Sequence, residues 1–165
     1  MNIRTAVRRI KTFKPETPEE FADAGVPVLD DKKFVHAGVF REVYRIVGVP
    51  LVVKFPLGDS RKETGEGRRH TNAEVNRIKR LSAFPVMRKY LPKVYYHDKA
   101  SGIVVMRYYA DLDEKWTDYD IMINKFIQDL IKDITGIRLS DVHDGNVRSS
   151  NGKPTWRPVM IDCGY

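Results

Sequence analysis

The apolar pattern between residues 33 and 137 changes from strand-like to helical twice, and this order limits the folds open to the chain. Three β-rich segments come first, and a tight turn at residues 47–50 joins the last two. One helical segment follows, then two strand-like segments joined by a short polar turn, and then a long helical segment. The strand-like segments are residues 32–40, 41–48, 50–56, 93–98 and 102–109. An antiparallel meander interrupted by a helix predicts an α+β fold.

Two helices are predicted within this stretch. The first, residues 70–81, follows a polar loop at residues 58–67 and carries Glu74. The second, residues 119–137, has apolar residues at helical spacing, and Gly136 is placed to end it. Its apolar residues are Ile121, Ile123, Phe126, Ile127, Leu130, Ile131 and Ile134. We therefore expect this second helix to be long and mostly buried.

Two further helices are predicted at the N-terminus. Residues 2–13 place apolar side chains on one face and Arg or Lys on the other, which is typical of an amphipathic helix. Thr17 is placed to cap a second helix, with Glu20 completing a capping box and Gly25 ending the helix. Together they predict an N-terminal helical extension, residues 1–32. The basic face of the first helix is either a solvated surface or one that meets phosphates.

Composition narrows the class of protein. The chain has 165 residues, of which 42% are hydrophobic and 31% charged, as in soluble globular proteins. No apolar run approaches the roughly 20 residues of a membrane span, so we expect a cytoplasmic protein without a membrane partner. The single cysteine, Cys163, cannot form an internal disulfide. The net charge of +7 predicts attraction to nucleotides, nucleic acid or acidic protein surfaces.

A dense polar cluster, DVHDGNV at residues 141–147, follows the long helix and precedes a predicted hairpin turned at residues 149–154. Two carboxylates, an imidazole and a carboxamide surround one glycine, which fits a solvated turn, a metal site or part of a catalytic cleft. A hydrolytic metal site would combine His143 with Asp141 and Asp144, but no second histidine stands at a ligand-like spacing. The choice depends on residues elsewhere in the chain.

Five polar residues occur in the same order as the functional residues of a known protein family. Lys54 ends a strand-like segment, Glu74 follows 20 residues later on a helix, Asp141 and Asn146 lie in the polar cluster, and Asp162 begins an Asp-x-Gly element. Over about residues 33 to 165, the chain resembles the protein-kinase-like superfamily. The sequence DVHDGN, residues 141–146, is most similar to the catalytic loop of aminoglycoside and choline phosphotransferases.

The resemblance implies a fold and a domain organisation. It implies a kinase-like N-lobe at residues 33–110, an antiparallel sheet with one helix. It also implies a strongly reduced C-lobe at residues 111–165, made of the long helix, the catalytic loop and the hairpin. The long helix would then lack its usual cover, so we expect the N-terminal helix or a second copy of the chain, in a homodimer, to cover its apolar face.

The resemblance also implies ATP and Mg²⁺ as cofactors. Asp141 would orient the acceptor hydroxyl, Lys54 would contact the donor phosphates, and Glu74 would hold Lys54. Asn146 and Asp162 would bind Mg²⁺, which prefers oxygen ligands. The residues expected at the nucleotide are Gly38, Arg41, Lys54, Glu74, Met106 and Tyr108.

The chain departs from the family pattern at several positions. The family's Gly-rich loop keeps only Gly38, with His36 and Arg41 in the places of the other two glycines. Arg41 would supply a charge where backbone amides approach phosphate less closely. Leu139 stands where the family has a histidine, and Cys163 replaces a bulky apolar residue.

Three functions remain open from the sequence. One is a minimal ATP-dependent phosphotransferase that acts on a hydroxyl of a protein or a small molecule. Another is a pseudokinase-like regulatory module that binds a nucleotide or a protein. The third is a basic nucleic-acid-binding protein. The residues that favour the third are Arg68, Arg69, Arg77, Lys79, Arg80, Tyr95, Tyr96, Tyr108 and Tyr109.

Overall fold

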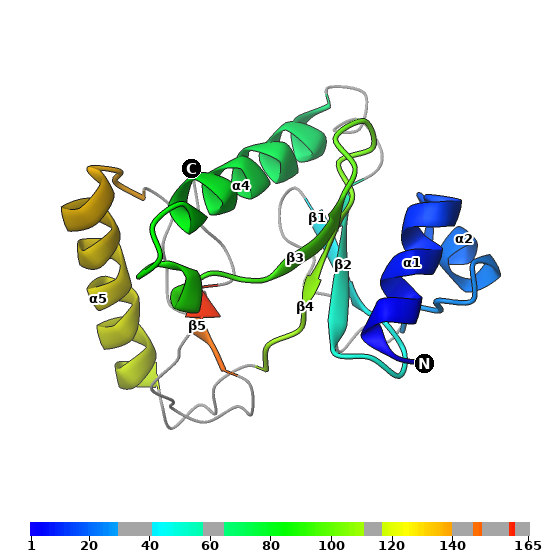
Figure 1. Cartoon of the computed structure of the whole chain (residues 1–165), viewed down its shortest axis with the longest axis horizontal. Coiled ribbons are helices and arrows are strands. Elements are labelled where there is room, and N and C mark those ends of the chain that lie inside the picture. The colour runs from blue at the N-terminus through cyan, green and yellow to red at the C-terminus, as the bar shows by residue number, and fades with distance from the viewer. Residues whose placement is uncertain (30–40, 58–64, 111–116, 140–146, 150–158, 161–165) are drawn as a thin grey trace. The chain divides into compact units, whose positions relative to one another are not determined.

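Helices and strands alternate along the chain as the sequence predicts, and the computed structural model confirms an α+β fold (Figure 1). The structure describes residues 1–29, 41–57, 65–110, 117–139, 147–149 and 159–160. It divides into two units, residues 1–72 with 93–108 and residues 73–92 with 109–165. The predicted divisions after residues 32 and 110 stay a prediction.

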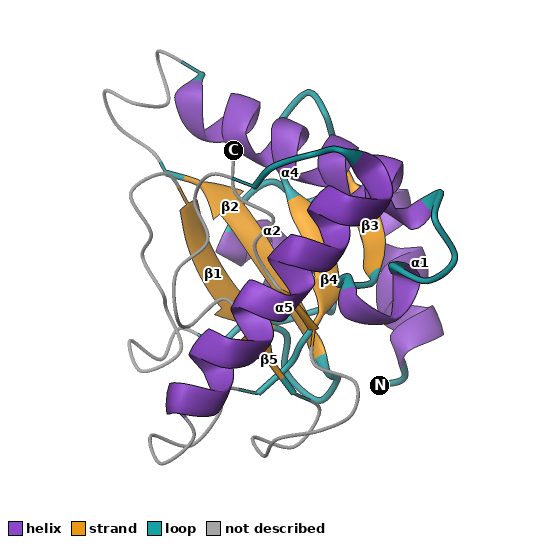
Figure 2. Ribbon diagram, turned by 90° about the vertical axis from the view of Figure 1, so that its left-hand side faces the viewer, coloured by secondary structure: helices purple, strands orange, loops and turns teal. Residues whose placement is uncertain are grey.

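Within the described residues of the first unit, four strands form an antiparallel sheet in the order β1-β2-β4-β3 (Figure 2). The strands are β1 (Arg41–Arg45), β2 (Leu51–Pro56), β3 (Val94–His97) and β4 (Val104–Arg107). Gly48, with φ of 74°, lies in the predicted turn between β1 and β2. The predicted strand at residues 32–40 lies outside the described residues.

The N-terminal helices begin and end close to the predicted positions. They are α1 (Ile3–Phe13) and α2 (Pro18–Asp23). The hydroxyl of Thr17 accepts a hydrogen bond from Glu20 N at 3.2 Å, which confirms the predicted cap. In a capping box, the carboxylate of Glu20 would accept a hydrogen bond from the backbone N–H of the cap, Thr17. Here it accepts from Glu16 N, one residue before the cap, at 2.7 Å.

Both N-terminal helices pack on one face of the sheet (Figure 1). Ala6 and Ile10 of α1 are buried in the same core as Val53 of β2. The ring of Phe21 on α2 meets the ring of Phe55 edge-on, with centroids 5.4 Å apart. From the sequence, either α1 or a second copy of the chain is expected to cover the apolar face of the long helix. The structure places the apolar face of α1 in the core of the sheet.

The third helix, α4 (Glu66–Ser82), begins four residues earlier than predicted, so Glu66 and Gly67 belong to a helix and not to the polar loop. Its first part is tied to the turn between β3 and β4. The guanidinium of Arg68 donates to Ala100 O at 3.2 Å, and the amide nitrogen of Asn72 donates to Lys99 O at 3.2 Å. The amide oxygen of Asn72 lies 2.7 Å from Nε2 of His97. These bonds fix the start of α4 within the first unit.

The second unit contains the rest of α4, a 3₁₀ turn η1 (Arg88–Tyr90), α5 (Thr117–Thr135), β5 (Val147–Arg148) and β6 (Val159–Met160). The strands β5 and β6 pair antiparallel, as expected for the predicted hairpin. Ala110 and Ser149 exchange two backbone hydrogen bonds, of 2.7 and 3.1 Å. Gly136, with φ of 70°, follows the end of α5 as predicted.

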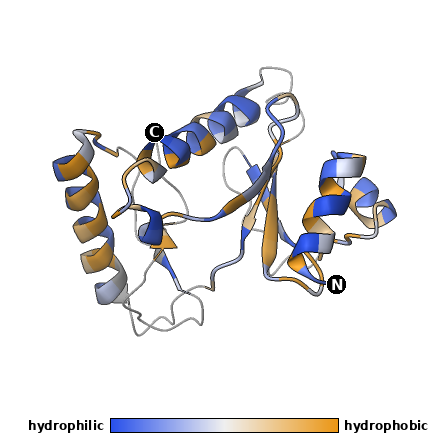
Figure 3. Ribbon diagram, in the orientation of Figure 1, coloured by the Kyte–Doolittle hydropathy of each residue, from blue (hydrophilic) through white to orange (hydrophobic). Residues whose placement is uncertain are grey.

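The prediction that the long helix is mostly buried is wrong. Ile127 and Ile131 of α5 are fully buried, but Ile121, Met122 and Phe126 are 53%, 59% and 50% exposed. Hydrophobic residues recur along the whole of α5, whereas α4 is largely hydrophilic (Figure 3). A helix that is apolar on more than one face cannot be assigned one buried face from spacing alone. The homodimer stays a prediction.

None of the helices that the structure describes combines the length and the apolar character needed to cross a membrane.

Candidate functional site

The two faces of strand β2 differ in chemistry. Because successive side chains of a strand point to opposite faces, Leu51, Val53 and Phe55 enter the core beneath α1 and α2. Lys54 therefore points to the opposite face, together with Val52. Lys54 is only 6% exposed, and β2 lies between β1 and β4 in the sheet. The predicted phosphate-binding lysine is thus held on a central strand.

The strand register places other predicted residues on the same face as Lys54. Val43 of β1 and Val104 of β4 are the direct partners of Lys54. Arg41 pairs with Pro56, two residues beyond Lys54, and Met106 pairs with Val52, two residues before it. Tyr108 comes two residues after Met106, and its N–H donates to Pro50 O at 2.9 Å, which continues the ladder. We call this side of the sheet the lysine face.

The two ends of the lysine face carry different predicted residues. Arg41 and Lys54 lie toward one end, and Met106 and Tyr108 lie toward the other. At about 3.3 Å per residue, the four residues from Val104 to Tyr108 separate the level of Lys54 from that of Tyr108 by about 13 Å. The strands thus hold Lys54 and Tyr108 at a fixed separation.

Arg45 is a residue of this face that was not predicted from the sequence. It pairs with Val52, and its guanidinium lies 4.3 Å from the centre of the Tyr108 ring. This cation–π contact restrains the tyrosine. The period-two alternation of Arg41, Val43 and Arg45 was the signal that would have placed it here.

The carboxylate of β1 lies on the other face of the sheet. Glu42 pairs with Phe55, which belongs to the core, and Tyr44 Oη donates a hydrogen bond to Glu42 Oε2 at 3.0 Å. Of the described residues on the lysine face in β1, β2 and β4, none is acidic. An anion approaching Lys54 along these strands would therefore meet only cations and neutral groups.

Glu74 lies on α4, in the part of that helix that belongs to the second unit, and is 3% exposed. Among the described residues, Lys54 and Glu74 are the only buried side chains that carry a charge. Lys and Glu are almost never fully buried unless they are paired, because removing a charge from water is costly. Neither side chain is without a partner. Pairing between these two residues stays a prediction.

The predicted catalytic loop and metal ligands, Asp141, Asn146 and Asp162, lie outside the described residues, as does Gly38. The strands next to them are described. Val147, which follows Asn146 directly, pairs with Met160, which precedes Asp162 by two residues. The strand ends that lead to the two predicted ligands are therefore neighbours.

Elsewhere in the described ranges, no three His, Cys, Asp or Glu residues are grouped so that they could hold a metal ion.

Compared with known proteins, the chain matches no family model and no curated protein. Its function must therefore be inferred from the residues themselves.

Proposed function

We propose that this protein is a minimal ATP- and Mg²⁺-dependent phosphotransferase of the kinase-like type, which transfers a phosphoryl group to a hydroxyl of a protein or a small molecule. One observation carries the proposal. The two charged side chains that are buried among the described residues are Lys54 and Glu74, and the resemblance assigns these same two to the donor phosphates. The cytoplasm, which supplies ATP and Mg²⁺, is the proposed compartment.

The lysine face supports a direction for the nucleotide. We place the base toward the side chains of Val52, Met106 and Tyr108, which are apolar or aromatic, beside the guanidinium of Arg45. The phosphates then extend toward Lys54 and Arg41. This orientation matches the separation of about 13 Å along the strands, which leaves room for the sugar between the two ends.

Burial strengthens the interaction of Lys54 with phosphate. A charge in a region of low dielectric acts more strongly than one in water, and a fixed ammonium needs no reorganisation during the reaction. Glu74 would keep Lys54 in place by pairing with it. Arg41 would add a second cation where a Gly-rich loop would otherwise offer backbone amides.

Transfer requires a residue that orients the acceptor hydroxyl, and the resemblance gives this role to Asp141. Asn146 and Asp162 offer the oxygen ligands that Mg²⁺ prefers, and their positions beside paired strand ends favour a shared site. When bound, the metal would neutralise charge on the nucleotide phosphates.

A thermal shift measurement tests nucleotide binding. The wild-type protein should gain stability with ATP in the presence of Mg²⁺, and Lys54→Met should lose most of this gain. A wild-type protein that shows no such shift and transfers no labelled phosphate would rule out the proposal.

Asp141→Ala separates binding from transfer. This variant should keep the thermal shift with ATP and lose phosphate transfer to the protein itself or to an added acceptor. A wild-type protein that binds ATP and transfers nothing would instead favour the regulatory binding module.

A further inference from the structure

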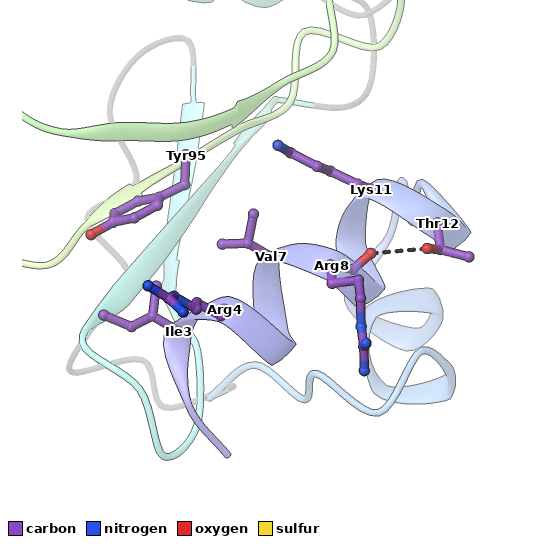
Figure 4. A pocket seen from close by; sticks show the side chains of 7 residues that line it. All are labelled: Ile3, Arg4, Val7, Arg8, Lys11, Thr12 and Tyr95. Carbon is purple, nitrogen blue, oxygen red and sulfur yellow. Dashed lines mark hydrogen bonds between the residues drawn. The ribbon is translucent and has the colours of Figure 1, made fainter.

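A second candidate site lies on the first unit, away from the lysine face. An open hollow of about 400 Å³ lies between α1 and β3. Its lining residues are Ile3, Arg4, Val7, Arg8, Lys11, Thr12 and Tyr95. All but Tyr95 come from α1, and Val7 projects between the helix and the tyrosine (Figure 4).

The hollow combines an apolar floor with a basic rim. Ile3, Val7 and Tyr95 are half-buried and offer hydrocarbon surface. Arg4, Arg8 and Lys11 are exposed. Their spacing of four and three residues puts them along one side of the helix. No lining residue is acidic, and residues 1–14 contain five Arg or Lys and no Asp or Glu.

The helix that carries the rim is held firmly, so the hollow exists before any partner binds. Ala6 and Ile10 of α1 are fully buried in the core, and Ile3, Val7 and Tyr95 pack against the same core. The guanidinium of Arg9 donates to Gly25 O at 2.8 Å and ties α1 to the end of α2. Arg9 therefore has a structural role, whereas the cations of the rim point to solvent.

We propose that this hollow docks an acidic, amphipathic peptide segment of a partner protein. A Leu or Phe side chain of the segment would enter between Val7 and Tyr95, and its Asp or Glu side chains would meet Arg4, Arg8 and Lys11. Apolar anchors with charges around them are the usual way in which a short helix binds a groove. Guanidinium groups also bind carboxylates in a planar, two-point geometry.

The chemistry favours a peptide over a nucleic acid. Single strands bind by stacking bases on flat aromatic side chains, and here Ile3 and Val7 are aliphatic. The ring of Tyr95 already has the ammonium of Lys93 5.1 Å from its centre. The hydroxyl of Thr12 donates a 3.0 Å hydrogen bond to Arg8 O, so its proton is not available to donate to a base edge.

The test uses the full chain and a labelled synthetic peptide that repeats Leu at helical spacing among Glu residues. Fluorescence anisotropy should detect binding that weakens as salt is added. A control peptide with the same Glu residues and Ser in place of Leu should bind markedly less. If binding depended on charge alone, the Leu peptide and the Ser peptide would bind with equal affinity.

A pair of charge-reversal variants locates the site. Arg4→Glu with Arg8→Glu should weaken peptide binding by at least about tenfold, because attractive pairs become repulsive ones. Lys79→Glu with Arg80→Glu makes the same change of charge at exposed positions of α4 and should leave binding close to that of the wild type. Circular dichroism should show that both variants are folded.

Three results would overturn the docking proposal. They are equal binding of the Leu and Ser peptides, equal loss in the two charge-reversal variants, and preferential binding of a labelled single-stranded oligonucleotide that depends on Arg4 and Arg8. None of them bears on phosphate transfer, because the hollow shares no residue with the lysine face.

Discussion

Lys54 and Val104 face each other across the antiparallel strands β2 and β4, and both are buried, with exposures of 6% and 0%. An ammonium group beside a buried valine requires compensation by an anion. The resemblance assigns this role to Glu74. The pairing of Lys54 with Glu74 stays a prediction, and measurements of stability can test it.

Replacing Lys54 with Met should destabilise the protein by about 3 kcal/mol, because it leaves a buried carboxylate without its counter-charge. Glu74→Gln alone should destabilise it comparably. The double variant should be less destabilised than the sum of the two, with a coupling of at least about 1 kcal/mol in urea unfolding. Additive losses would show that the two residues do not pair.

Arg41→Ala should weaken ATP binding by about tenfold, because a charged hydrogen bond to phosphate contributes about 1.5 kcal/mol. Arg107→Ala is the matched control. Arg107 is an exposed cation at the end of β4, and it alternates with Met106, so its side chain points away from the lysine face. Isothermal titration with ATP and Mg²⁺ measures both variants. A similar loss in both would assign the effect to net charge.

The elements of the first unit were well predicted from the sequence because each has a local cause. The cap at Thr17 and the turn glycine Gly48 follow from residue type, and the strands follow from their apolar runs. Their arrangement was harder to predict. That α1 packs on the sheet depends on contacts between residues far apart in the chain, such as Ile10 with the residues around Val53.

The candidate site was predicted in part for a similar reason. Lys54 and Glu74 were singled out from their order and spacing; both are buried, and their role at a site stays a prediction. Arg45 was missed because its position over Tyr108 depends on the register of β1 against β2 and of β2 against β4. Register is a tertiary property, and the pattern within one strand gives only the alternation.

Gly102 is predicted to be required by close packing as well as by its backbone conformation. Its φ is 78°, and a Cβ there would lie 2.8 Å from Cα of Arg68 on α4. Gly102→Ala should therefore destabilise the protein by more than about 2 kcal/mol.

Gly48 is the matched control for Gly102. Its φ is 74°, and no neighbouring atom lies within 4 Å of the position that a Cβ would take. Gly48→Ala should cost about 1 kcal/mol, from the backbone conformation alone. Equal losses in urea unfolding would show that α4 does not approach the β3–β4 turn as closely as described.

Tyr96 should make stability fall at high pH. Burial raises the pKa of its hydroxyl above the usual value, and the nearby carboxylates of Asp98 and Glu16 raise that pKa further. The folded state therefore favours the neutral phenol. This contribution is fully present below the unfolded-state pKa of about 10 and is lost as the pH rises through the folded-state pKa.

Tyr96→Phe removes this titration, so its free energy of unfolding should fall less steeply above about pH 10 than that of the wild type. Urea unfolding of both proteins at several pH values measures the difference. Identical slopes for the two proteins would show that Tyr96 titrates alike in the folded and unfolded states.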